Sequence, residues 1–377
     1  MVSDFPLRDN KIKGGISALV YYFAQEINKH EEIDFHILAC LKELREAVVR
    51  KIGRTTIHYL PSSRLPHLIT TFTIRKWKMK KKLKELNPDI VHLQGQSRHS
   101  YPVLNSGFLT ILSVHGIMYE EVKYLKKNIF KFIRSYLYKM IEKKCLKNVD
   151  YIIASNEYAY QKIKHLAKTN KFYLLKNPVD PIFFNLEREP IKNRLLYAGK
   201  IDPRKGLEYL LDAVFLLSKN IELELHVVGP IVRQDYKKIL LELVDEKKMN
   251  NFVYFKGLIS QEGLFEEFRR CHILVLPSNE ETSPMVIEQA MAAGIPVVAT
   301  KAGGITYLIK DNITGRLVNA RDSASIASGI LDLIKNPDKC DYLTKNAKEY
   351  ARLNFDVKKI ANEMVIVYKE ITKGTDN

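Results

Sequence analysis

The chain has 377 residues, of which 46% are hydrophobic, and a formal net charge of +17 from 60 basic and 43 acidic residues. This length exceeds one ordinary hydrophobic core, so two globular domains are expected. Because there is no run of about eighteen apolar residues and no charged-then-apolar leader, we expect neither a membrane span nor a secretory signal, and a cytoplasmic protein. The cysteines are scattered singly, without metal spacing or a disulfide framework, and are expected only to pack: Cys40, Cys145, Cys271 and Cys340.

The first half of the chain shows the alternation of a parallel sheet with crossover helices. It opens with a short segment before Gly14, Gly15 and a helix. Either the first strand is reduced to residues 2–5, or the stated start lies inside the natural reading frame. Further strands are expected at residues 35–40, 56–60, 89–95, 109–116 and 150–156. We therefore predict an N-terminal Rossmann-like domain over residues 1–178.

The positive charge is concentrated in two segments of this half. Residues 75–84 read RKWKMKKKLK, with no acid. Residues 123–147 mix basic and aromatic side chains, and an apolar stripe recurs at spacings of three and four, which predicts a helix that buries the stripe and borders it with cations. The members of this pattern are Lys126, Lys127, Lys131, Arg134, Lys143 and Lys144, with Tyr124, Phe130, Phe132, Tyr136 and Tyr138, and the stripe Ile129, Ile133, Tyr136 and Met140.

An anionic membrane surface is the partner that this pattern favours. Each Lys or Arg near an anionic bilayer contributes about 1 kcal/mol to binding, and aromatic side chains suit the interface. A solvated face around an ordinary core stripe is the main alternative, and nucleic acid is a minor one.

A proline-containing and then polar stretch, residues 176–190, links the two halves. Beyond it, strands are expected at residues 195–199, 223–229, 252–257, 272–278, 296–300 and 315–318, with helices at 206–217 and 236–245. This rhythm predicts a second Rossmann-like domain over residues 190–354. Ligand should lie between the two sheets, outside the carboxyl ends of their strands.

Residues 276–300, LPSNEETSPMVIEQAMAAGIPVVAT, place carboxylates at a strand end directly before a helix. Thr282 and Ser283 are expected to cap this helix and Pro284 to occupy its first turn, so that Met285 continues it to residue 293. The amides of that turn would carry roughly half a positive charge, while one of the preceding glutamates accepts hydrogen bonds from hydroxyl groups. A neutral polyol joined to an anion would match both features.

The same stretch resembles the nucleotide-sugar site of glycosyltransferase family 4, in which P-S-x-x-E precedes a helix with E-A-M-A-x-G-x-P-V-V-A. Aligned on the P-S pair, the first acid of the family falls on Glu281 and the second, eight positions on, falls on Gln289. An alternative register would pair Glu280 with Glu288, if the loop were one residue shorter. The resemblance implies that the first acid holds sugar hydroxyls and that the second position binds the nucleotide ribose.

Other positions resemble the donor site of the same family. In YAGKIDPRKG, residues 197–206, Lys200 and Lys205 are expected to bind the diphosphate, although the family usually has arginine at the first of them. His115 corresponds to the histidine that the family places against an outer hydroxyl of the donor sugar. The candidate catalytic residues are therefore His115, Lys205 and Glu281. The remaining residues that we expect around the donor are Gly14, Gly15, Gly229, Ile259, Thr282, Ser283, Pro284 and Met285.

The resemblance implies an α/β protein of the GT-B type, with two facing Rossmann-like domains and a cleft between them. Residues 355–377 resemble the C-terminal helix that crosses back to the first domain, with Phe355 and Tyr368 as its anchors. The implied reaction is retaining transfer of a sugar from a nucleotide diphosphate donor to a glycan or lipid-linked acceptor, without a metal or cofactor. With the basic surface, this suggests a peripheral position on the inner face of the membrane.

Three rival functions remain open on the sequence. A glycoside hydrolase would use Glu281 and Glu288 as its two carboxylates, but hydrolysis would give the lysine pair no task. A basic module that binds nucleic acid or another anion would not need the donor site, and its binding would be sensitive to salt. An epimerase on the same architecture is a minor possibility.

Overall fold

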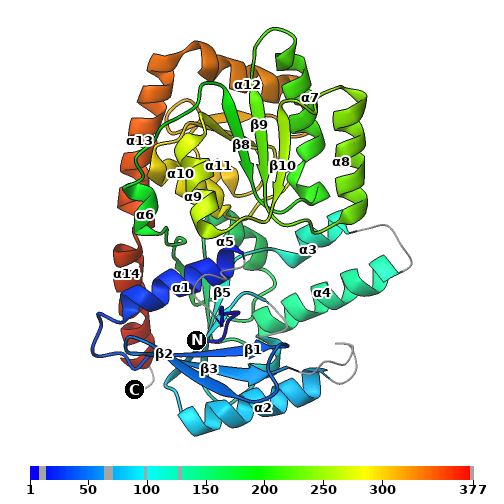
Figure 1. The fold of residues 1–377 in the computed structure, drawn as a ribbon. Coiled ribbons are helices and arrows are strands. Elements are labelled where there is room, and N and C mark those ends of the chain that lie inside the picture. The colour runs from blue at the N-terminus through cyan, green and yellow to red at the C-terminus, as the bar shows by residue number, and fades with distance from the viewer. Residues whose placement is uncertain (8–13, 63–70, 97–99, 126–129, 374–377) are drawn as a thin grey trace. The chain divides into compact units, whose positions relative to one another are not determined.

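The computed structural model describes residues 1–7, 14–62, 71–96, 100–125 and 130–373. The chain divides into two compact units, of which the first combines Met1–Pro178 with the residues from Val357 on, and the second is Val179–Asp356 (Figure 1). Each unit has its own parallel strands and its own hydrophobic core. The chain therefore leaves the first unit after residue 178 and returns to it after residue 356.

The first unit contains a three-stranded and a four-stranded sheet, ordered β1-β3-β2 and β4-β5-β6-β7. Val2 forms parallel bridges to Leu38 in β1 and to Leu93 in β4, so the short first segment lies between the two sheets. Only β2 is antiparallel, and neither β2 nor β7 was among the predicted strands. The strands are β1 (His36–Leu41), β2 (Val48–Ile52), β3 (Thr55–Pro61), β4 (Ile90–Gln94), β5 (Leu109–Val114), β6 (Tyr151–Ala154) and β7 (Phe172–Leu174).

The helices of the first unit include one from the C-terminal end of the chain. That helix, α14, runs beside α1, and the two are coloured red and blue in Figure 1. Tyr368 of α14 contacts His92 of β4, as the expected anchoring requires, and Lys369 pairs with Glu32 at 2.9 Å. The helices are α1 (Gly15–Ile27), α2 (Thr71–Leu86), α3 (Met118–Glu121), α4 (Phe130–Lys147), α5 (Glu157–Ile163) and α14 (Val357–Lys373), with 3-10 turns η2 (Tyr101–Val103) and η3 (Val122–Tyr124).

The proposed anchoring role of Phe355 is wrong. Phe355 is the last residue of α13 (Pro337–Phe355) and is fully buried in the core of the second unit. The crossing helix begins two residues later, at Val357.

Helix α4 forms where the basic and aromatic pattern predicted it, but its predicted stripe is not buried. Ile133 and Tyr136 are 51% and 64% exposed, and Met140 is only partly buried, whereas the neighbouring Ile141 is buried. The outer half of the helix, residues 131–138, therefore lies outside the core, and this corrects the expected burial. Ile129, Lys126 and Lys127 lie outside the described residues.

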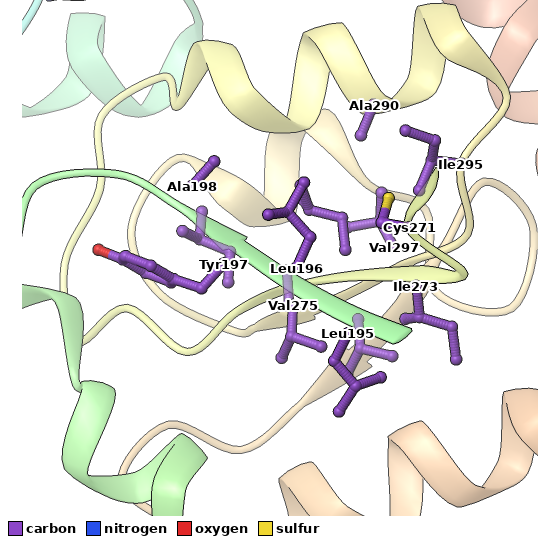
Figure 2. Close-up of a cluster of buried hydrophobic side chains, with 14 of the residues drawn as sticks. Leu195, Leu196, Tyr197, Ala198, Cys271, Ile273, Val275, Ala290, Ile295 and Val297 are labelled. Atoms are coloured by element: carbon purple, nitrogen blue, oxygen red, sulfur yellow. The ribbon is translucent and has the colours of Figure 1, made fainter. Parts of the chain in front are cut away.

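The second unit has one six-stranded parallel sheet, ordered β10-β9-β8-β11-β12-β13. Apolar side chains from β8, β11 and β12 interdigitate with Ala290 of α10, as Figure 2 shows. Such continuous apolar runs are typical of strands covered on both faces. The strands are β8 (Arg194–Ala198), β9 (Glu224–Val228), β10 (Val253–Gly257), β11 (Ile273–Leu276), β12 (Val297–Thr300) and β13 (Arg316–Val318).

Helices of the second unit connect these strands, as the predicted alternation requires. Asp202 caps the turn η4, because its side chain accepts a hydrogen bond from the amide of Arg204 at 3.0 Å. The elements are α6 (Pro181–Phe184), η4 (Pro203–Lys205), α7 (Leu207–Ser218), α8 (Gln234–Glu246), α9 (Gln261–Arg270), α10 (Met285–Ala293), α11 (Ile305–Leu308), α12 (Ser323–Lys335) and α13. All four cysteines are buried free thiols, as expected.

Candidate functional site

The carboxyl ends of β8 and β11 bring Lys205 and Glu281 into direct contact. Lys205 ends η4, after β8, and Glu281 lies between β11 and α10. Lys205 Nζ donates a hydrogen bond to Glu281 Oε1, and Arg204 Nη1 lies 3.4 Å from Glu281 Oε2. Ser278 Oγ donates to the same carboxylate at 2.7 Å. The structure thus joins the lysine and the acid that the sequence placed at two separate strand ends.

The Lys205–Glu281 pair is buried, with side chains 11% and 6% exposed. Burial raises the pKa of Glu281, but attraction to Lys205 and Arg204 outweighs it, so this pKa lies below its usual value. Burial lowers the pKa of Lys205, and the attraction of Glu281 opposes that shift. The Glu281 carboxylate is thus held by two cations, as a buried charge requires. Cations gathered at these strand ends are suited to an anionic ligand.

Close backbone contacts hold the two loops together. Gly206 has a φ of +61°, and a Cβ there would lie 2.4 Å from the carbonyl oxygen of Pro277. The amide of Asn279 donates to the carbonyl oxygen of Arg204 at 2.8 Å. Only glycine allows this approach, so the backbone itself places η4 against the loop that carries Glu281.

Helix α10 begins at Met285, but its predicted caps are wrong. Pro284 occupies the N-cap position and not the first turn, so neither Thr282 nor Ser283 is the capping residue. Ser283 Oγ instead donates to Glu288 Oε1 at 2.8 Å, because that buried carboxylate lies on the first turn of the helix. The first amides of α10 still lack partners within the helix, as at any helix N-terminus.

The two possible registers, Glu281 with Gln289 and Glu280 with Glu288, involve residues that differ in burial. Glu288 is fully buried, whereas Gln289 is partly exposed on the next position of α10. Glu281 is buried against Lys205, and Glu280 is only partly buried. Of the two candidate acids before the helix, Glu281 is therefore the one that contacts the predicted lysine.

Three further predicted donor residues lie at strand ends of the same sheet. Lys200 is exposed just after β8. Gly229 follows β9 with a φ of +138°, and a Cβ there would lie 1.9 Å from the carbonyl oxygen of Gly199. Ile259 follows β10 and packs partly against the core. The second unit therefore gathers its predicted residues along one edge of its sheet.

In the first unit, His115 follows β5 and lies in an uncharged network. His115 Nε2 lies 2.6 Å from Gln94 Oε1, and burial lowers the pKa of His115 to about 4. A cavity of about 30 Å³ adjoins the ring, with room for one or two water molecules. Its polar lining includes Lys176, Asn177 and Ser155. The Asn177 side chain hydrogen-bonds to His115, and the buried Ser155 Oγ has no hydrogen-bond partner.

Gly14 and Gly15 mark the start of α1 in this unit. Gly14 is the N-cap with a φ of +87°, and Gly15 is the first helical residue. A Cβ on Gly14 would meet no atom within 4 Å. The glycine is therefore required for backbone conformation and not, in this structure, for a close contact.

Sequence reasoning missed Arg204, Ser278 and Gln94. Arg204 stands beside Lys205 in the motif PRKG, so its basic side chain was a signal that we overlooked. Ser278 lies three residues before Glu281, so its contact was also close in the sequence. The role of Gln94 depends on His115, 21 residues away, and has no local signal.

The described residues contain neither a metal-binding cluster nor a helix that could cross a membrane. Across residues 1–7, 14–62, 71–96, 100–125 and 130–373, no group of three or more His, Cys, Asp and Glu side chains could hold a metal ion. Within that same part of the chain, none of the helices combines the length and apolar character that crossing a membrane requires.

Comparisons with known proteins match both halves of the chain. The model described as "Glycosyl transferases group 1" matches residues 179–350, and "Glycosyltransferase Family 4" matches residues 13–183. A D-inositol 3-phosphate glycosyltransferase of Streptomyces coelicolor is 34% identical over 164 residues, which cover 42% of this chain and 36% of that protein. An uncharacterized glycosyltransferase of Methanocaldococcus jannaschii is 25% identical over 370 residues, which cover 95% of both chains. The aligned segments span 36% and 44% of the first two curated relatives.

Solved structures agree with the fold. Sucrose-phosphate synthase from Thermosynechococcus elongatus superposes with a TM-score of 0.84 at 20% identity, covering 99% of both chains. HepE of Anabaena, solved with UDP and glucose, gives a TM-score of 0.73 at 17% identity and covers 98% of this chain and 100% of that one. At these identities the likeness shows the architecture alone. The two family models together extend from residue 13 to residue 350, and the chain belongs to the group 1 glycosyltransferases of family 4, with the GT-B fold.

Proposed function

We propose that this protein transfers a sugar from a nucleotide diphosphate donor to an acceptor hydroxyl, with retention at the anomeric carbon and without a metal ion. The bond from the anomeric carbon to the β-phosphate oxygen breaks, the acceptor oxygen bonds to that carbon, and the acceptor proton passes to the departing phosphate. The observation that carries the proposal is the meeting of two cations, Lys205 and Arg204, with Glu281 at the carboxyl ends of β8 and β11. Such charge stabilises the leaving group as it develops.

Each part of the donor has a matching group in the second unit. The diphosphate suits Lys205, Lys200 and the first amides of α10, because anions bind favourably at helix N-termini. The Glu281 carboxylate, partly occupied by its cations, accepts hydrogen bonds from sugar hydroxyls. A glycoside hydrolase fits less well, since Glu288 is fully buried and hydrogen-bonded to Ser283. His115 of the first unit would contact the sugar, as the family resemblance implies.

A screen of nucleotide sugars tests this proposal, starting with UDP-glucose because HepE was solved with it. We expect nucleoside diphosphate to be released with an acceptor present, together with a glycosylated product. Release of free sugar at the same rate without any acceptor would instead support hydrolysis. Salt-sensitive binding to DNA with no affinity for any nucleotide sugar would support the anion-binding alternative.

The acceptor is proposed to be a glycan or a lipid-linked molecule, reached from an anionic membrane surface on the cytoplasmic side. The outer half of α4 supports this. Phe132, Ile133 and Tyr136 are 82%, 51% and 64% exposed. From Lys131 to residue 141 the sequence contains three basic residues and no acid. Apolar rings bordered by cations suit the headgroup region of an anionic bilayer.

Three neighbouring basic residues of α2, Lys80, Lys81 and Lys82, are less available for binding a membrane than the sequence suggested. Lys80 Nζ donates to the carbonyl oxygen of Asn105 at 2.6 Å, and Lys82 pairs with Glu85 at 2.9 Å. Lys81 lies 5.6 Å from the ring centroid of Trp77. Neutralising Lys80, Lys81 and Lys82 is therefore expected to weaken vesicle binding less than changes on α4.

Vesicle flotation tests the membrane surface. Phe132→Ser, Ile133→Ser and Tyr136→Ser together should reduce binding to vesicles with anionic lipid by about tenfold or more, since each buried apolar side chain contributes about 1.5–3 kcal/mol. The matched control changes Ile239 and Leu241 to serine, because these apolar residues are exposed on α8 between residues of both charges. Equal binding by both variants, or equal binding to neutral vesicles, would count against this surface.

A further inference from the structure

A chain of hydrogen bonds connects the C-terminal helix to His115. Tyr368 Oη of α14 lies 2.6 Å from His92 Nδ1 on β4, and the two rings meet edge to face with centroids 5.8 Å apart. His92 Nε2 lies 3.1 Å from Gln94 Nε2 and 2.7 Å from Ser113 Oγ. Gln94 Oε1 then lies 2.6 Å from His115 Nε2. All these residues belong to the first unit.

The Gln94 amide gives this chain a direction. Its nitrogen only donates, so His92 Nε2 must be the acceptor, and the single ring proton of His92 must lie on Nδ1 and point to Tyr368. Its oxygen only accepts, so His115 must carry its proton on Nε2. Gln94 thus couples the tautomers of two imidazoles that do not contact each other directly.

Burial keeps both imidazoles neutral. Each ring then carries a single N–H proton, and the nitrogen that holds it defines the tautomer. Desolvation lowers the pKa of His115 to about 4 and that of His92 well below its usual value. His92 and Gln94 are 2% and 4% exposed. A neutral imidazole has one donor and one acceptor nitrogen, and hydrogen bonds in a dry environment are strong.

We infer that Gln94 is a positioning residue, through which Tyr368 and His92 hold His115 as the Nε2–H tautomer and leave Nδ1 as a hydrogen-bond acceptor. This inference rests on the proposed function for its consequence. His115 also hydrogen-bonds to the Asn177 side chain. An acceptor nitrogen takes a hydrogen bond from the Asn177 amide or from a sugar hydroxyl, whereas the other tautomer would donate at that position. Helix α14 follows the second unit in the chain, so it contributes to the first unit's site from 276 residues beyond His92.

Nitrogen-15 NMR of the histidine rings tests the inference on the whole chain, without any substrate. We expect His115, assigned by loss of its signals in His115→Asn, to show a protonated Nε2 and an unprotonated Nδ1. In Gln94→Met, which keeps the side-chain length without its polar atoms, His115 should populate both tautomers. A wild-type His115 protonated on Nδ1 would overturn the inference, because it would mean that the Gln94 amide has the opposite orientation.

Two matched tyrosine variants, each removing one hydroxyl that contacts α14 or belongs to it, extend the test to turnover. Tyr368→Phe removes the acceptor for His92, whereas Tyr173→Phe removes a hydroxyl that lies 3.3 Å from Glu370 on the same helix but outside the network. We expect kcat to fall about tenfold in Gln94→Met and less in Tyr368→Phe, with little change in KM, and no change in Tyr173→Phe. Circular dichroism and thermal unfolding confirm that each variant is folded.

The possible failures are distinguishable. If the tautomers are as expected but no nucleotide sugar is turned over, the hydrogen-bond network stands and the proposed function fails. If transfer occurs but Gln94→Met leaves both the tautomer and kcat unchanged, the positioning role of Gln94 fails and the proposed function stands.

Discussion

The candidate site of the second unit is charged, whereas that of the first unit is neutral. Lys205, Arg204 and Glu281 meet as ions, and the pKa of Glu281 is lowered although burial opposes this. Around His115, neutral groups form the contacts, and burial lowers the pKa of the imidazole. Both sites lie at the ends of parallel strands in related folds. The difference shows that the partners of a buried group, and not burial alone, decide its charge.

A charged site suits a phosphate, and a directional hydrogen-bonding site suits hydroxyl groups. The predictions below would break or sharpen the comparison, from the largest expected effect to the smallest.

Removing charge in the second unit should have the largest effect. Lys205→Ala is expected to lower kcat by about a hundredfold or more, because it removes the buried cation that stabilises the leaving group. Gln289→Ala should cost only a few-fold, since a neutral hydrogen bond is weaker than a charge-assisted one. Steady-state kinetics with the donor found in the screen measures both. Comparable turnover of the two variants would refute this ranking.

Substitution by alanine should destabilise the protein more at Gly229 in the second unit than at Gly14 in the first. Gly229→Ala is expected to destabilise the protein by about 2–4 kcal/mol, because the new Cβ would overlap the carbonyl oxygen of Gly199. Gly14→Ala should cost about 1–2 kcal/mol, the strain of a positive φ without a clash. Urea unfolding measures both. Equal losses would show that the approach to Gly199 relaxes easily.

Neutralising the acid should alter diphosphate affinity and turnover in opposite directions. Glu281→Gln removes the negative charge that Lys205 and Arg204 share, so we expect the nucleoside diphosphate product to bind about tenfold more tightly. Turnover should fall about tenfold because sugar hydroxyls lose a charged acceptor. Calorimetry and kinetics test this, with Glu280→Gln as the control. Weaker diphosphate binding in Glu281→Gln would contradict a role of these two cations in binding the diphosphate.

Lowering the pH should reduce the stability that neutral His115 contributes to the fold. The pKa of His115 in the folded protein, about 4, lies below its ordinary value of 6.5, so the unfolded chain binds the proton first as pH falls. The stability contributed by neutral His115 is present above about pH 6.5 and is lost progressively towards pH 4, by about 1–2 kcal/mol at pH 5. His115→Asn should therefore lose less stability than the wild type between pH 7.5 and pH 5. Equal losses by the two proteins would mean that His115 already binds its proton in the fold.

The sequence alone determined the order of strands and helices, the parallel sheets and the family motif. These follow from apolar runs, helical periodicity and local turn residues, which require no knowledge of distant contacts. The sequence also predicted that Lys205 and Glu281 lie at one edge of a sheet, because the carboxyl ends of parallel strands converge. The edge strands β2 and β7 were missed, since β2 is largely exposed and β7 has only three residues.

Only the tertiary structure decided the partners of these residues and their charge. Lys205 and Glu281 are 76 positions apart, Gln94 and His115 are 21 apart, and His92 and Tyr368 are 276 apart. The burial of Glu288, the exposure of the outer half of α4 and the neutral state of His115 likewise depend on which segments pack together. Periodicity in a sequence describes one element at a time, whereas hydrogen bonding and desolvation depend on groups that folding brings together from distant parts of the chain.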